Sequence, residues 1–109
     1  MKTPRLAAPL ALSTAMLAIP FVSNAEPHIS YAGGDGSSIE KAVIIKGAKE
    51  EMSGVHAEYE WLAKHFPGYQ RKQQELISQK GHSYDLLHFV AADGKEHDVY
   101  FDITGFFGK

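Results

Sequence analysis

Residues 84–103, YDLLHFVAADGKEHDVYFDI, decide the fold because two alternating apolar and polar runs flank an Asp-Gly pair. Asp-Gly in this setting is the strongest short-range signal for a β-hairpin. With Asp93 and Gly94 as the two central turn residues, Leu86 faces Phe101 and Tyr84 faces Ile103. The face predicted to form the core then carries Tyr84, Leu86, His88, Val90, His97, Val99, Phe101 and Ile103.

The opposite face of this hairpin is predicted to point outward, and it mixes apolar with acidic side chains. A strip of exposed apolar residues on a small protein is typical of a surface that binds a partner. This face is centred on Leu87, Phe89, Asp98, Tyr100 and Asp102.

Residues 49–66, KEEMSGVHAEYEWLAKHF, are predicted to form the main helix, because apolar residues recur at steps of three and four. Pro67 and Gly68 end it. Gly54 costs a helix about 1 kcal/mol relative to alanine, which indicates a close packing contact at that position. The stripe predicted to face the core is Met52, Val55, Tyr59, Leu62 and Phe66.

Two further strands are predicted at residues 42–46 and 69–78, in addition to the hairpin strands at 84–91 and 96–103. The expected order is strand, helix, strand, strand, strand. We therefore predict an α+β domain over residues 39–109, with one main helix packed on an antiparallel sheet of three to four strands. Residues 26–38 are rich in Gly and Ser and are expected to be a flexible lead-in.

Residues 1–25 have the pattern of an export signal: Lys2 and Arg5, an apolar run, and a small-residue cleavage site at Ala25. Prolines and hydroxyls interrupt the run, so cleavage is favoured over a retained membrane anchor. The chain has no cysteine, so a disulfide and a lipid-modified cysteine are both excluded. We expect a periplasmic or secreted protein whose fold is stabilised by its hydrophobic core, without disulfides.

The charge balance excludes nucleic acid as an expected partner. Removal of Lys2 and Arg5 leaves nine Lys and Arg against 13 Asp and Glu, a formal charge of −4. Nothing in the sequence resembles a basic stripe that could neutralise phosphates.

From about Tyr59 onward the chain resembles the PepSY domain, a small exported module with a helix followed by a hairpin-rich antiparallel sheet. The resemblance rests on HFPG at the helix end, on YDLLHFVAADGKEHDVYFD as two strands around a turn, and on DITG as a closing turn. It implies a binding module without catalytic activity, for which regulation of peptidases has been proposed in the family.

A metal-binding or enzymatic protein is the alternative prediction. Asp85 and Asp102 face each other in the predicted register, and such a pair either binds a cation or shares a proton, unless Asp102 caps the following turn. His88 and His97 are diagonal neighbours there, yet the sequence has no metal-ligand spacing such as H-E-x-x-H. We therefore expect no catalytic, metal or cofactor site.

Trp61 lies off the predicted helix stripe, so it is either a packing residue or an exposed anchor for a partner. We predict an exported, non-catalytic binding or inhibitory module whose partner is a protein or peptide of the cell envelope. A homodimer is a further option, because the predicted outer face is apolar. The residues predicted to bind the partner are Leu87, Phe89, Asp98, Tyr100 and Trp61.

Overall fold

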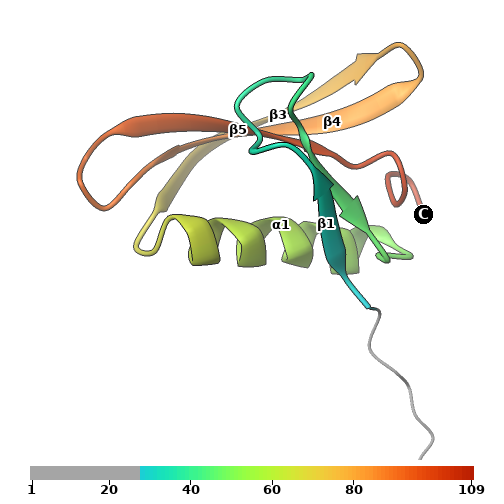
Figure 1. Ribbon diagram of the computed structural model, residues 1–109, viewed down its shortest axis with the longest axis horizontal. Coiled ribbons are helices and arrows are strands. Elements are labelled where there is room, and N and C mark those ends of the chain that lie inside the picture. Colours follow the sequence, from blue (N-terminus) through green and yellow to red (C-terminus); the bar gives the residue numbers. More distant parts are fainter. Residues whose placement is uncertain (1–27) are drawn as a thin grey trace, which may run out of the picture.

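The computed structural model describes residues 28–109, in which one helix packs on one face of a five-stranded sheet (Figure 1). The strand order is β1-β2-β5-β4-β3, and β2 runs parallel to β5 while the other neighbours are antiparallel. The α+β class with one main helix is confirmed, although the sheet is mixed and has five strands. The predicted export signal lies outside the described residues. The elements are β1 (Ser30–Gly33), β2 (Val43–Lys46), α1 (Glu51–His65), β3 (Gln70–Gln79), β4 (His82–Val90) and β5 (Glu96–Asp102).

Strand β1 lies within the segment that we predicted to be a flexible lead-in, so this part of the prediction is wrong. It pairs with β2 and places Tyr31 opposite Ile45. The Tyr31 hydroxyl donates a hydrogen bond of 2.8 Å to the backbone carbonyl of Ala57 in α1. One aromatic side chain and a short backbone ladder therefore hold a segment whose composition is typical of a linker.

The hairpin of β4 and β5 forms as predicted, but its register differs by one residue. Leu87 faces Val99 and Phe89 faces His97. The Ala91 N–H bonds the Lys95 carbonyl at 2.8 Å and closes a three-residue loop in which Gly94 has a φ of 87°. Such loops combine a type I turn with a left-handed residue. Because side chains alternate, this shift exchanges the two faces of β4 relative to the prediction.

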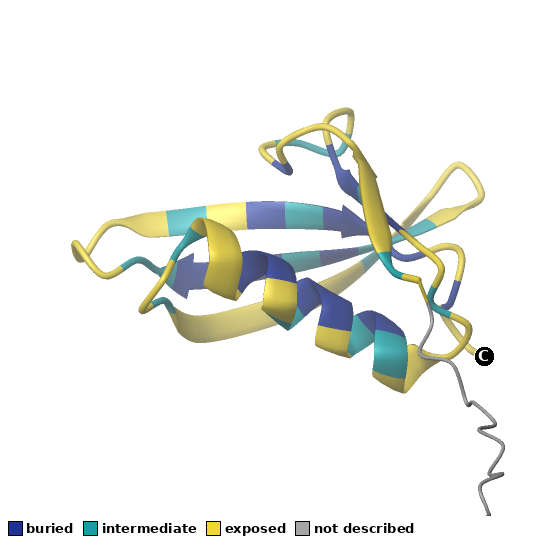
Figure 2. Cartoon of the chain, turned by 60° about the horizontal axis from the view of Figure 1, so that its bottom comes forward, coloured by how far each residue is buried: buried dark blue, intermediate teal, exposed yellow. Residues whose placement is uncertain are grey.

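The core lies between α1 and the inner face of the sheet (Figure 2). Leu87, Phe89 and Phe101 are fully buried there. The prediction that Leu87 and Phe89 point outward is therefore wrong, and the prediction that Val99, Phe101 and Ile103 belong to the core is confirmed. The predicted core residues Tyr84, Leu86, His88 and Val90 lie instead on the partly exposed outer face.

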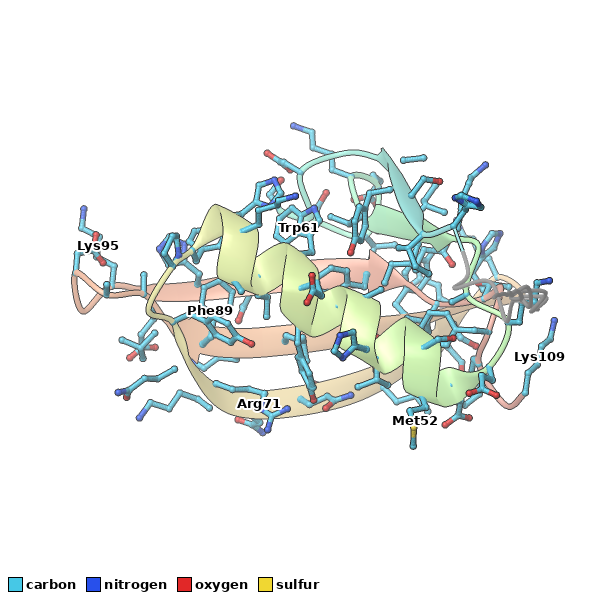
Figure 3. All side chains as sticks on the ribbon, turned by 90° about the horizontal axis from the view of Figure 1, so that it is seen from below. Met52, Trp61, Arg71, Phe89, Lys95 and Lys109 are labelled. Carbon is cyan, nitrogen blue, oxygen red and sulfur yellow. The ribbon has the colours of Figure 1, made fainter. Side chains whose placement is uncertain are left out.

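Helix α1 turns a different face to the sheet from the one predicted. Met52 is 79% exposed and projects from the side of the helix (Figure 3), while Tyr59 and Phe66 only border the core. The spacing of apolar residues in α1 predicted the wrong face, because two of the buried positions are occupied by Gly54 and Glu58, which are not apolar side chains. The buried residues of α1 are Gly54, Ala57, Glu58, Trp61 and Leu62.

The segment after β5 folds back onto the first turn of α1. The Phe106 ring is buried directly over Gly54, where a Cβ would overlap it. This confirms the predicted close contact at Gly54, whereas the neighbouring Phe107 remains 41% exposed. Glu51 accepts a 2.7 Å hydrogen bond from the Gly108 N–H. Within residues 28–109, no helix has the length and apolar character needed to span a membrane.

Candidate binding groove

The predicted partner-binding residues do not form one surface. Asp98 and Tyr100 lie on the outer face of β5, as predicted. Leu87 and Phe89 lie on the inner face, and Trp61 is only 8% exposed, with its ring edge-on to Phe101 at a centroid distance of 5.5 Å. Trp61 is therefore mainly a packing residue.

The predicted pairing of Asp85 with Asp102 is wrong, because the two carboxylates lie on opposite faces of the hairpin. Asp85 faces Phe101 in the interior, whereas Asp102 faces Tyr84 on the outside. Asp102 accepts hydrogen bonds from the backbone N–H of Thr104 at 3.0 Å and from its hydroxyl at 2.6 Å. Asp102 therefore has the alternative role that we considered: it caps the turn that follows β5.

The predicted proximity of His88 and His97 is wrong for the same reason. His97 stacks on Phe89 on the inner face, with 5.5 Å between ring centroids. His88 lies outside, with Nδ1 2.6 Å from Asp98 and Nε2 3.2 Å from Glu96. The hydrogen bond to Asp98 raises the pKa of His88. Among residues 28–109, no three His, Asp or Glu side chains converge as metal ligands would.

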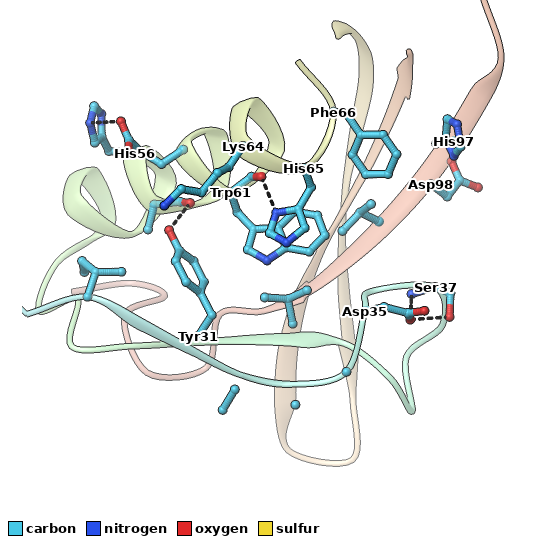
Figure 4. Close-up of a pocket in the computed structure, with 18 of the residues that line it drawn as sticks. Tyr31, Asp35, Ser37, His56, Trp61, Lys64, His65, Phe66, His97 and Asp98 are labelled. Atoms are coloured by element: carbon cyan, nitrogen blue, oxygen red, sulfur yellow. Dashed lines mark hydrogen bonds and ion pairs between the residues drawn. The ribbon is translucent and has the colours of Figure 1, made fainter. Parts of the chain in front are cut away.

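A groove of about 1040 Å³ lies between α1, β1 with the loop that follows it, and the first half of β5 (Figure 4). Its size is that of sites that bind small molecules or short peptide segments. We call it the α1–β1 groove.

Aromatic side chains form the wall of the α1–β1 groove on the α1 side. The Trp61 ring stacks on the His65 ring with 3.9 Å between centroids. His65 Nδ1 lies 2.9 Å from the Trp61 carbonyl oxygen, which fixes the imidazole. Tyr31 crosses from β1 to α1 at one end, and Phe66 closes the other side together with His97. The wall is therefore apolar and held in place by several contacts.

The charged groups that line the α1–β1 groove are mostly acidic: Asp35, Glu60 and Asp98 against the single Lys64. Asp35 accepts hydrogen bonds from the Ser37 hydroxyl at 2.7 Å and the Ser37 N–H at 3.0 Å. These bonds lower the pKa of Asp35, so its carboxylate is ionised at neutral pH. The groove therefore suits a ligand with both apolar and basic groups.

A buried pair of carboxyl groups lies outside the groove, between α1 and the sheet. Glu58 is fully buried, Asp85 is 5% exposed, and neither carboxylate oxygen of Glu58 has a hydrogen-bond partner among residues 28–109. Burial, and secondarily the neighbouring Asp85, raises the pKa of Glu58 to about 10. A proton on Glu58 gives it an O–H donor that Asp85 can accept. Because both carboxyl groups are buried, we regard the pair as structural.

Sequence reasoning missed one side of the α1–β1 groove because it treated residues 26–38 as a linker. Tyr31, Asp35 and Ser37 all lie in that segment. The available signal was Asp35-Gly36-Ser37, a pattern in which a carboxylate commonly accepts from the amide two residues later. The tertiary contact of Tyr31 with α1 has no local signature.

Comparison with known proteins gives no relative: no protein-family model, no curated protein and no solved structure matches the chain.

Proposed function

We propose that this protein is a small, non-catalytic binding module of the cell envelope, and that the α1–β1 groove is where it holds a segment of a protein or peptide partner. The observation that carries this proposal is the groove itself. It combines a fixed aromatic wall, formed by Trp61, His65 and Phe66, with an acidic rim. Apolar walls with a few placed polar groups are typical of binding sites.

The location in the envelope rests on the sequence pattern of residues 1–25. The resemblance to the PepSY domain from about Tyr59 onward supports a more specific role, as a regulator or inhibitor of a peptidase or another periplasmic protein. The groove replaces the outer face of the hairpin as the proposed binding surface, because Leu87 and Phe89 are buried.

Site-specific photo-crosslinking in the organism that encodes the protein tests this proposal. A p-benzoylphenylalanine in place of Ser37, an exposed residue that lines the groove, is expected to give a discrete adduct with one envelope protein or peptide. The same group in place of Gln74, an exposed residue of β3 outside the groove, is the matched control.

An adduct from both positions, or from neither, would contradict the groove as the binding site. An adduct found only with cytoplasmic proteins would contradict the proposed location.

A further inference from the structure

We propose that the α1–β1 groove binds its partner by β-strand addition: an extended peptide with alternating apolar and basic side chains pairs with the open edge of β5 at Glu96 and Asp98. This inference rests on the proposed function, since it specifies how the same groove would hold a segment of a partner.

The first observation is that β5 has a neighbouring strand on its β2 side along only part of its length. The β2 strand pairs with β5 at Phe101 and Asp102 only. The remainder of β5, from Glu96 to Tyr100, is paired with β4 on the other side. Among the described residues, no strand occupies the position next to Glu96–Val99, and His97, Asp98 and Val99 line the groove there.

The second observation is the direction of the backbone groups of β5. The Tyr100 N–H points away from β4, because it donates a hydrogen bond of 2.8 Å to the Gly36 carbonyl. In an antiparallel strand, the N–H and C=O of one residue point to the same side, and this side alternates along the chain. The N–H and C=O of Asp98 and Glu96 therefore point into the groove, as those of an edge strand do.

The loop after β1 limits the length of this open edge. It is tied back by hydrogen bonds from the Gly34 N–H to Ala42 and from the Gly36 N–H to Lys41. Because Gly36 already bonds Tyr100, an added strand has room beside the four residues 96–99, about 13 Å at the rise of a strand. Such a segment can form up to four backbone hydrogen bonds with Glu96 and Asp98.

The surroundings of the open edge define the side chains of the peptide. Side chains of an added strand alternate between the two faces of the sheet. Those on the inner face would lie near Trp61 and Phe66, which suits apolar residues. Those on the outer face would lie near Glu96 and Asp98, which share the imidazole of His88. The groove rim adds Asp35 and Glu60 against Lys64, so acidic groups remain in excess. This charge balance selects basic residues.

The two outer edges of the sheet are less suited to this role. Strand β3 carries a bulge between Arg71 and Gln73 and two cationic residues beside it, devices that discourage strand pairing. Strand β1 has four residues and ends at Gly33, whose φ is 81°. Strand β3 also contributes no residue to the lining of the groove.

Amide hydrogen exchange measured by NMR on the isotopically labelled protein tests the inference. The probe is the synthetic peptide acetyl-Val-Lys-Val-Lys-Val-amide at millimolar concentration. Without peptide, the amides of Glu96 and Asp98 are expected to exchange quickly, unlike that of Val99, which points to β4. With peptide, both are expected to become protected, and the Trp61 and His65 resonances to shift.

Two controls separate backbone pairing from other binding. Asp98→Pro removes the N–H that points into the groove and leaves the ladder to β4 intact, while Asp98→Ala removes the same carboxylate and keeps the N–H. The proline variant is expected to bind the peptide at least about tenfold more weakly than the alanine variant. A peptide N-methylated at alternate amides is expected to lose binding to the unaltered protein, so the test does not depend on the proline variant folding.

Protection of Glu96 and Asp98 together with loss of binding by the N-methylated peptide supports strand addition. Shifts of Trp61 and His65 without protection of these amides, or equal binding by the two peptides, would overturn strand addition while leaving the groove as a binding site. No shift anywhere in the protein would overturn the proposed peptide class, and the photo-crosslinking result would then decide separately on the groove.

Discussion

The inner and the outer face of the β4–β5 hairpin have similar apolar content but differ completely in burial. Leu87, Phe89, Val99 and Phe101 on the inner face are at most 3% exposed. Tyr84, Leu86, Val90 and Tyr100 on the outer face are all partly exposed. On the outer face, His88 bonds two carboxylates, whereas on the inner face the buried Asp85 lies beside the buried Glu58 of α1. The position of α1, rather than the hydrophobicity of either face, makes one of them the core.

The largest expected effect comes from truncating neighbouring residues that lie on opposite faces. Phe89→Ala leaves a cavity in the core and is expected to lower the free energy of unfolding by about 3–5 kcal/mol. Val90→Ala, on the partly exposed outer face, is the matched control and is expected to cost about 1 kcal/mol or less. Urea unfolding followed by Trp61 fluorescence measures both. Equal costs would contradict the pairing of Phe89 with His97 and the assignment of the two faces of β4.

A smaller effect, which depends on pH, is expected from Glu58→Gln in the inner carboxyl pair. Glu58 keeps its proton in the folded protein up to about pH 10, whereas the unfolded chain releases it near pH 4.5. The unfolded state therefore binds fewer protons between these values, and the stability of the protein falls as the pH rises. We expect a slope of about 1 kcal/mol per pH unit between pH 6 and pH 9.

Glu58→Gln removes this titration and keeps a donor for Asp85, so its unfolding free energy should depend less on pH and exceed that of the unaltered protein at pH 9. Glu60→Gln changes an exposed carboxylate of the same helix and serves as the control. An unchanged slope in Glu58→Gln would show that Glu58 is ionised in the folded protein.

The smallest effect is expected on the outer face, from His88→Gln. The pKa of His88 is raised in the folded protein by Asp98, so its contribution to stability is present below its unfolded pKa and is lost as the pH rises through the folded value. Relative to the unaltered protein, the variant should lose more stability at pH 5.5 than at pH 8. The His88 titration followed by NMR gives an independent reading, and an ordinary pKa would contradict the contact with Asp98.

Much of the fold could be predicted from local patterns. The helix begins within two residues and ends within one residue of the predicted positions, and the strands at 42–46, 69–78, 84–91 and 96–103 are each observed with small shifts. Asp93-Gly94 correctly located the turn. It did not determine the loop length, because a glycine in the left-handed region fits a two-residue and a three-residue loop alike. That difference of one residue moved Leu87 and Phe89 from the surface to the core.

The candidate site was harder to predict, because its parts become neighbours only through the tertiary fold. Residues 31–37, the last turns of α1 and the start of β5 have no common sequence signal. The buried Glu58 also contradicts the usual assignment of glutamate to the surface, and this moved the predicted helix stripe away from Gly54 and Trp61. Only a contact with Asp85, 27 positions later, makes its burial understandable.

The contact of Phe106 with Gly54 also has a kinetic consequence. The ring that covers the first turns of α1 comes 52 positions later in the chain, so this contact closes a long loop. Contacts of this kind slow folding, because the chain loses its freedom before the contact is gained. During synthesis, α1 and β2 are made before β4 and β5, so the core cannot form until those later strands are present. Slow folding of this kind would suit the export that we propose, because a chain that crosses a membrane must still be unfolded.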